Sequence, residues 1–185
     1  MKIIICPSEY EYKILKGFKS YKHNVLVVES GMGKIKMAWC LHELIQMVEF
    51  ERQNPEFILS GFCGGLSGYK VGDVVSPLTF IQGDYHGLDT SEVINKLGAK
   101  PFEAIISQDS FLESNPYAID YRNYKYLSTD MESYTFAYFC QKSNITYKVV
   151  KIISDLVDNK AKEDFALSCN KLSSKLKNTV IKLII

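Results

Sequence analysis

Polar side chains follow three apolar runs of this sequence, at the points where buried strands are expected to end. They are Ser60, the stretch 107–109, and the pair Ser154 and Asp155. Ligands of α/β sheets bind beyond the carboxyl ends of the strands, so functional side chains are expected here rather than on the helices. Asp155 is the sharpest candidate, because a carboxyl group partly removed from water has a raised pKa and can donate a proton near neutral pH. A turn or helix-capping aspartate is an equally good interpretation of its position.

Other acidic residues also have two interpretations each. Glu132 lies at the start of an apolar helix, where a buried carboxylate needs a partner or a function. It could equally complement the helix dipole from the first turn. Glu9 and Glu11, after the first apolar run, present the same choice. Tyr85 and His86 hint at acid–base chemistry, although a lone histidine is more often structural.

Two glycine-rich segments, 31–34 and 61–68, permit a close approach of the backbone to a ligand. The segment 61–68 matches neither the phosphate-binding Walker motif nor the dinucleotide fingerprint, so a plain turn is its more probable interpretation. The segment 31–34 is an equally weak signal, which a tight turn at the start of the following helix explains. The sequence has no metal-ligand spacing and no Ser-His-Asp arrangement. We therefore expect neither a metal nor a cofactor.

The elements that must position these residues alternate between strands and helices. Apolar runs predict strands at 3–6, 24–28, 57–59, 71–80, 103–106 and 147–153. Helical spacing predicts helices at 10–18, 34–50, 90–97, 131–141 and from 162 to the C-terminus. In the helix at 34–50 the repeating apolar residues, expected to face the core, are Ile35, Ala38, Trp39, Leu41, Leu44, Ile45 and Val48. The alternation predicts one α/β domain over 1–185, with a sheet sandwiched by helices.

Composition narrows the class of protein. The chain has 185 residues, 46% hydrophobic and 23% charged, with a net charge of +1. Such a chain is an ordinary globular domain, and with only two arginines a nucleic-acid binder is not expected. Its five cysteines form no CxxC pair, and it has no apolar stretch of membrane-spanning length. The apolar run before Pro7 has only four residues, so we do not expect a signal peptide. We expect a reduced, cytoplasmic protein with a small-molecule partner, not a membrane.

Six segments of the chain together resemble a known family. They are MKIIICPSEYE at the start, SGMGKIKMA (30–38), SGFCGGLSGYKVGDVVSP (60–77), SQDSFL (107–112), TDMES (129–133) and VVKIISDLVDNKAKEDF (149–165). In this order they resemble the nucleoside phosphorylase/nucleosidase superfamily, and within it the 5′-methylthioadenosine/S-adenosylhomocysteine nucleosidases. The resemblance implies a three-layer α/β fold with a central mixed, partly barrel-like sheet flanked by helices. It also implies a homodimer that acts on a purine nucleoside.

The resemblance further implies three catalytic residues. Asp155 protonates N7 of the departing purine, and Glu132 holds the ribose hydroxyls through the oxocarbenium-like transition state. Glu11 activates the attacking water if one residue is deleted before it, and Glu9 is the other choice. The substrate-binding residues that the resemblance implies are Cys63, Gly64, Phe111, Leu112, Asp130, Met131, Ser154 and Phe165. Among them Asp130 pairs with Lys151, at a position where the family carries arginine.

A hydrolase transfers the sugar to water, and a phosphorylase transfers it to phosphate. Phosphorylases of this superfamily hold phosphate with arginines after the first strand and before the glycine-rich segment. This chain has no arginine at either place, because Arg52 and Arg122 lie elsewhere. Since arginine is the side chain best suited to bind phosphate, the sequence favours water as the acceptor.

The chain also departs from the family pattern. Phe62 stands where relatives usually carry a small polar residue near the ribose, and the stretches before Ser30 and between Tyr85 and Ile106 are shortened. Three hypotheses follow: a nucleoside hydrolase with an adenine-type substrate, a purine nucleoside phosphorylase, or an inactive relative that only binds nucleosides.

Overall fold

The computed structural model describes residues 1–20, 22–52, 54–84, 93–95, 103–116 and 124–184. Its strands form one mixed, nine-stranded sheet in the order β2-β1-β3-β8-β7-β5-β6, with β9 pairing both β3 and β4. The strands are β1 (Lys2–Cys6), β2 (Val25–Glu29), β3 (Glu56–Ser67), β4 (Val74–Val75), β5 (Thr79–Gln82), β6 (Val93–Asn95), β7 (Glu103–Ser107), β8 (Tyr126–Asp130) and β9 (Thr146–Asp155).

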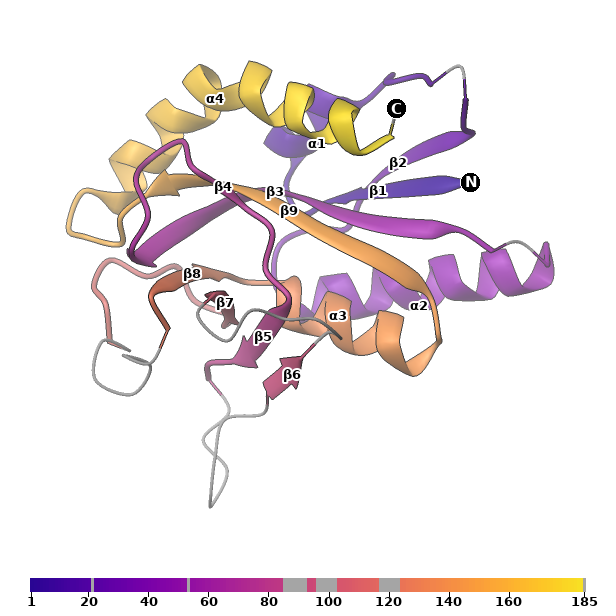
Figure 1. Cartoon of the computed structure of the whole chain (residues 1–185), viewed down its shortest axis with the longest axis horizontal. Helices are drawn as coiled ribbons and strands as arrows, with labels where there is room; N and C mark the ends of the chain where they lie inside the picture. The colour runs from indigo at the N-terminus through magenta and orange to yellow at the C-terminus, as the bar shows by residue number, and fades with distance from the viewer. Residues whose placement is uncertain (21, 53, 85–92, 96–102, 117–123, 185) are drawn as a thin grey trace.

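Four helices cover the two faces of this sheet. They are α1 (Glu9–Leu15), α2 (Lys34–Phe50), α3 (Ser133–Lys142) and α4 (Ala161–Ile184). Figure 1 shows α1 and α4 on one side of β1, β3 and β9, and α2 and α3 on the other. One apolar cluster joins the sheet to α2 and α3, and a second joins it to α1 and α4. The predicted three-layer α/β fold is confirmed. None of the described helices is long and apolar enough to cross a membrane.

Strand β3 is much longer than the predicted strand at 57–59, because the glycine-rich segment is itself part of the strand. The first part of β3 runs parallel to β1 and β9, and its end runs antiparallel to β8. Gly64 lies opposite Asp155 of β9 and Thr129 of β8. This strand therefore brings the ends of β8 and β9 together, and the plain turn expected at 61–68 is wrong.

Three other expectations are corrected. The strand predicted at 71–80 is divided into β4 and β5, and Pro77, which lacks a backbone donor, lies in the interruption. The helix predicted at 90–97 is wrong at 93–95, where β6 pairs antiparallel with β5; the other residues of that helix lie outside the described residues. Strand β8, which is flanked by β3 and β7, was not predicted. Tyr85 and His86 also lie outside the described residues.

Helix α2 has the bounds predicted for it, and three of its seven predicted apolar residues are buried, whereas two are exposed. Its buried residues are Met37, Leu41, Leu44 and Val48. Ile35 and Trp39 point to solvent, with 81% and 67% of their surface exposed. They lie four residues apart on one face, so helical periodicity alone could not tell the core from an exposed apolar stripe.

Candidate active site

A cavity of about 370 Å³ lies where β8 and β9 end, within the range of about 300–1,000 Å³ usual for small-molecule sites. The eleven residues predicted for the site all line it: Glu11, Cys63, Gly64, Phe111, Leu112, Asp130, Met131, Glu132, Ser154, Asp155 and Phe165. They come from six separate stretches of the chain. The sheet topology thus assembles the residues that the sequence singled out, while their chemical roles remain predictions.

Asp155 ends β9 with its carboxyl group buried, since only 2% of the residue is exposed. Its Oδ1 accepts a hydrogen bond from the Val157 amide (3.1 Å), and its Oδ2 lies 2.8 Å from the Ser154 hydroxyl. Burial raises the pKa of Asp155, and the two hydrogen bonds only partly oppose that shift. Asp155 therefore stabilises a turn through Oδ1 and also lines the cavity. Its raised pKa favours the protonated carboxyl group that proton donation requires.

Ser154 has one hydroxyl proton and two neighbouring oxygens to which it could donate. Its Oγ lies 3.1 Å from the Cys63 carbonyl and 2.8 Å from Asp155 Oδ2. When Ser154 donates to that carbonyl, a protonated Asp155 can donate to Ser154 in turn. The contact therefore accommodates the neutral form of Asp155 as well as the ionised form.

Glu11 and Glu9 lie on the same helix but in different environments. Glu11 is 4% exposed and lines the cavity, whereas Glu9 is exposed and pairs with Lys13 at 2.7 Å. Glu11 Oε2 accepts hydrogen bonds from the Ser8 amide (2.7 Å) and hydroxyl (2.6 Å), which forms the capping box of α1. Its Oε1 reaches β3 and accepts from the Phe62 amide at 2.7 Å. Of the two acids, the geometry favours Glu11 for chemistry in the cavity.

Glu132, Asp130 and Lys151 form a buried charged cluster. Lys151 Nζ lies 2.9 Å from Asp130 Oδ2 and 3.6 Å from Glu132 Oε2. Glu132 Oε1 accepts a hydrogen bond from the Gly33 amide at 2.8 Å, just before α2. Glu132 precedes α3 without capping it, so its role there is not that of a first-turn acid. Burial raises the pKa of Glu132 to about 7, against the opposing effect of Lys151.

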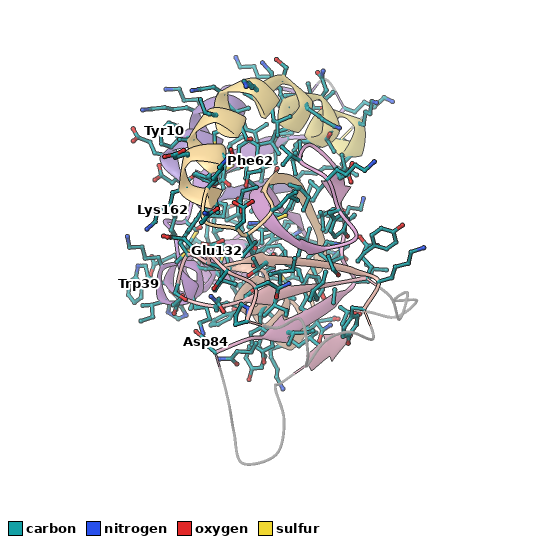
Figure 2. All side chains as sticks on the ribbon, turned by 90° about the vertical axis from the view of Figure 1, so that its left-hand side faces the viewer. Tyr10, Trp39, Phe62, Asp84, Glu132 and Lys162 are labelled. Atoms are coloured by element: carbon teal, nitrogen blue, oxygen red, sulfur yellow. The ribbon has the colours of Figure 1, made fainter. Side chains whose placement is uncertain are left out.

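Aromatic and apolar side chains form the remaining wall of the cavity. The Phe165 ring meets the Phe62 ring edge to face at 6.4 Å and the Phe111 ring at 5.9 Å. Phe62 is 4% exposed and packs in the cluster between the sheet and α4, so its ring narrows the cavity without closing it. In Figure 2 the buried Phe62 and Glu132 lie near the middle of the view, whereas the exposed Tyr10 and Trp39 lie at its edge.

Several lining residues were not identified from the sequence. They are Pro7, Ser8, Met32, Phe62, Ser110, Thr129, Val157 and Lys162, of which Phe62 was noted only as a departure. Ser8 had a usable signal, because Ser at the N-cap with Glu three residues later is the capping-box pattern. Phe62, Ser110 and Thr129 directly adjoin predicted site residues in the chain, whereas Met32 lies far from all of them and is brought to the cavity only by the fold.

Gly61 makes room for Glu11, a function that its place in a glycine-rich segment did not reveal. A Cβ atom added to Gly61 would lie 2.2 Å from Glu11 Oε1. Because the obstructed atom is the end of a flexible side chain, Gly61→Ala should leave the fold intact and displace the Glu11 carboxylate. We expect kcat to fall roughly 10- to 100-fold, since small misplacements of a catalytic group have effects of this size.

The matched control for this variant is Gly65→Ala on the same strand. Its added Cβ would meet only carbon atoms of side chains, at 3.2 Å or more. Steady-state kinetics of both variants, with thermal melting to verify folding, measure the effect. Equal activity in the two variants would contradict the role assigned to Gly61.

No arginine lines the cavity among the residues that the structure describes. Arg52 lies just after α2 and is exposed, and Arg122 lies outside the described residues. The described part of the chain also contains no group of three or more His, Cys, Asp or Glu residues arranged to hold a metal ion. All five cysteines are free thiols.

Comparison with known proteins finds relatives that share one enzyme name. A 5′-methylthioadenosine/S-adenosylhomocysteine nucleosidase of Buchnera aphidicola subsp. Acyrthosiphon pisum (strain Tuc7) is 28% identical over 205 aligned positions, covering 94% of this chain and 84% of the relative. The enzyme of the same name from Staphylococcus haemolyticus is 27% identical, covering 86% and 82%.

Solved structures share the fold. A Helicobacter pylori 5′-methylthioadenosine/S-adenosylhomocysteine nucleosidase superposes with a TM-score of 0.82 at 20% identity, covering all of this chain and 97% of that one. Futalosine hydrolase of the same species gives a TM-score of 0.80 at 18% identity, with the same coverage. The phosphorylase superfamily model matches residues 7–104 and 92–185. By this match, which spans nearly the whole sequence, the chain belongs to the phosphorylase superfamily.

Proposed function

We propose that this protein is a purine nucleoside N-ribosyl hydrolase that acts on an adenine nucleoside of the methylthioadenosine or adenosylhomocysteine type. The observation that carries the proposal is the convergence of Asp155, Glu132 and Glu11 on one cavity large enough for a nucleoside. The substrate class is taken from the names of the relatives that match most of the chain.

Each acid has a distinct part in the proposed reaction. Asp155 gives its proton to N7 of the purine as the bond between C1′ and the base nitrogen breaks, so the base leaves uncharged. Glu132 accepts hydrogen bonds from the ribose hydroxyls, and its negative charge stabilises the cationic sugar. Glu11 takes a proton from water while the water oxygen bonds to C1′. The products are the free base and the free sugar, and exchange with solvent restores both acids.

Water is favoured over phosphate as the acceptor by the charge around Glu11. Its carboxylate lines the cavity beside β3, and in the proposed reaction the acceptor binds next to it, so a phosphate anion there would meet a like charge. The buried cation Lys151 already pairs with two acids, and Lys162 pairs with Glu113. A phosphate would therefore lack the arginine fork that binds it best.

An assay for free adenine distinguishes the three hypotheses. Purified protein is incubated with methylthioadenosine, adenosylhomocysteine, inosine and a futalosine-type nucleoside, with and without phosphate, and the products are separated by chromatography. We expect adenine and free sugar without phosphate. Release that requires phosphate and yields ribose 1-phosphate would establish a phosphorylase. Thermal stabilisation by a nucleoside without turnover would identify a binding protein.

We further propose that the protein acts as a homodimer in the cytoplasm. The apolar stripe of Met32, Ile35 and Trp39 supports the dimer, since these residues are 57%, 81% and 67% exposed and Met32 also lines the cavity. The free thiols suit a reducing compartment. Sedimentation of the purified chain tests the dimer directly, and a monomeric mass would contradict it.

A further inference from the structure

Lys151 is a buried cation to which the proposed reaction assigns no step. It lies on β9 opposite Gly61 of β3, and none of its surface is exposed. A lysine removed from water is strongly unfavourable unless acids compensate it. The compensating groups are Asp130 at 2.9 Å and Glu132 at 3.6 Å, and the charge of Glu11 adds a smaller contribution. The cluster therefore joins an interior cation to one of the acids proposed to contact the substrate.

We propose that Lys151 is a positioning residue for this reaction, whose ammonium group favours the ionised Glu132 carboxylate and holds it at the cavity to receive the sugar hydroxyls. This inference rests on the proposed function for the identity of the sugar. The arrangement of the charges is independent of it.

Asp130 and Glu132 are held to different degrees, and the difference decides which of them depends on Lys151. Asp130 accepts from the Ser107 hydroxyl (2.6 Å), the Ser133 hydroxyl (2.5 Å) and the Ser133 amide (3.1 Å). Together with Lys151 these donors hold the pKa of Asp130 below its usual range despite burial. Asp130 thus remains a carboxylate that anchors the ammonium group.

Glu132 has far fewer donors. The Gly33 amide donates to Oε1 at 2.8 Å, and the ammonium group lies 3.6 Å from Oε2. Burial and the nearby charges of Asp130 and Glu11 all favour the protonated form of Glu132, and Lys151 opposes them. Glu132 is 4% exposed, so bulk water contributes little to stabilising its charge. If Lys151 lost its charge, a proton would bind to Glu132 rather than to Asp130.

The consequence is a specific pH dependence. A protonated Glu132 has lost its charge and much of its strength as an acceptor, so kcat/KM should decline as the pH falls through the pKa of Glu132, about 7. An opposite charge at this distance lowers the pKa of an acid by about 1–3 pH units. Replacing Lys151 with a neutral residue should raise, by about that amount, the pH below which kcat/KM declines. At neutral pH, kcat/KM should then fall roughly tenfold or more.

The test compares Lys151→Met with Lys151→Arg and with Lys148→Met. Methionine keeps much of the volume of lysine and removes the charge. Arginine keeps the charge, so Lys151→Arg should show the wild-type pH dependence of kcat/KM. Lys148 lies on the same strand and pairs with Glu56 at 2.9 Å, so Lys148→Met is the matched control and should change nothing. If Lys151→Met does not fold, Lys151→Gln replaces it, because its amide can still hydrogen-bond with Asp130.

Two readouts separate positioning from general damage to the site. Binding of free adenine, which has no sugar, should be unchanged in Lys151→Met, while binding of a non-cleaved nucleoside analogue should weaken. Lys151→Met in a Glu132→Gln background should add little to the loss from Glu132→Gln alone, since both changes remove the same interaction. The inference would be overturned if the pH dependence of kcat/KM did not shift in Lys151→Met, or if adenine and nucleoside binding weakened equally.

A measurement without substrate separates this inference from the proposed function. Carbon NMR of ¹³C-labelled glutamate follows the Glu132 carboxyl directly, with Glu132→Gln identifying its signal. Its titration should shift to higher pH in Lys151→Met and stay in place in Lys148→Met. Absence of base release from every nucleoside would defeat the proposed function, whereas an unshifted titration would defeat the role of Lys151.

Discussion

Asp155→Asn is expected to lower kcat roughly 100-fold or more while the protein remains folded. Asparagine has nearly the same shape and can still accept the hydrogen bond from the Val157 amide, but it cannot deliver a proton to the departing base. The loss should appear mainly in kcat, because protonation is needed in the transition state and not for binding. Near-wild-type turnover would refute the assignment of Asp155 as the acid.

The same variant should be at least as stable as the wild type at neutral pH. Burial raises the pKa of Asp155 above its usual value of 3.8, so the folded protein binds this proton more tightly than the unfolded chain does. The contribution of Asp155 to the free energy of unfolding therefore decreases as the pH rises above that value, and asparagine removes this decrease. Melting temperatures at pH 4 and pH 7 should show the advantage of the variant growing with pH.

Asp158→Asn is the matched control. Asp158 lies three residues further along the chain, is exposed, and accepts a hydrogen bond from the Lys160 amide. Its charge makes only a minor contribution to the raised pKa of Asp155, so its replacement should leave kcat nearly unchanged and alter the pH dependence of stability much less than Asp155→Asn does. A comparable loss of activity in Asp158→Asn would point to the segment before α4, rather than to the proton of Asp155.

Glu11→Gln is expected to lower kcat by a similar factor, roughly 100-fold, because a neutral amide cannot take a proton from the attacking water. Both carboxylate oxygens accept hydrogen bonds, from Phe62 and from Ser8, and glutamine can satisfy only one side. The free energy of unfolding should therefore also fall, by about 1–3 kcal/mol for an unsatisfied buried donor. Kinetics below the melting temperature of the variant separate the two effects.

Glu9→Gln provides the comparison for this variant. It makes the same chemical change on the same helix, where the carboxylate faces solvent and pairs with Lys13. We expect full activity from it, since exposed pairs of this kind contribute little. If Glu9→Gln were the inactive variant and Glu11→Gln the active one, the assignment of the water-activating acid would be reversed.

The sequence predicted much of the fold because local patterns agree with the final structure over most of the chain. Helix α2 and strands β1 and β7 lie where their apolar residues place them. The glycine-rich segment was misinterpreted because glycine is typical of turns, whereas here it clears space beside a strand for Glu11 and Asp155. Strand β8 was missed because Tyr126–Asp130 carries little apolar signal and depends on its neighbours β3 and β7.

The sequence by itself determined which side chains stand at the ends of buried segments, because strand length and apolar runs are local properties. Only the tertiary structure decided between Glu9 and Glu11, since they lie two residues apart and only Glu11 faces β3. It also decided that Lys151 contacts Glu132 as well as Asp130. Distances between residues far apart in the chain depend on sheet topology and register, which no local pattern specifies.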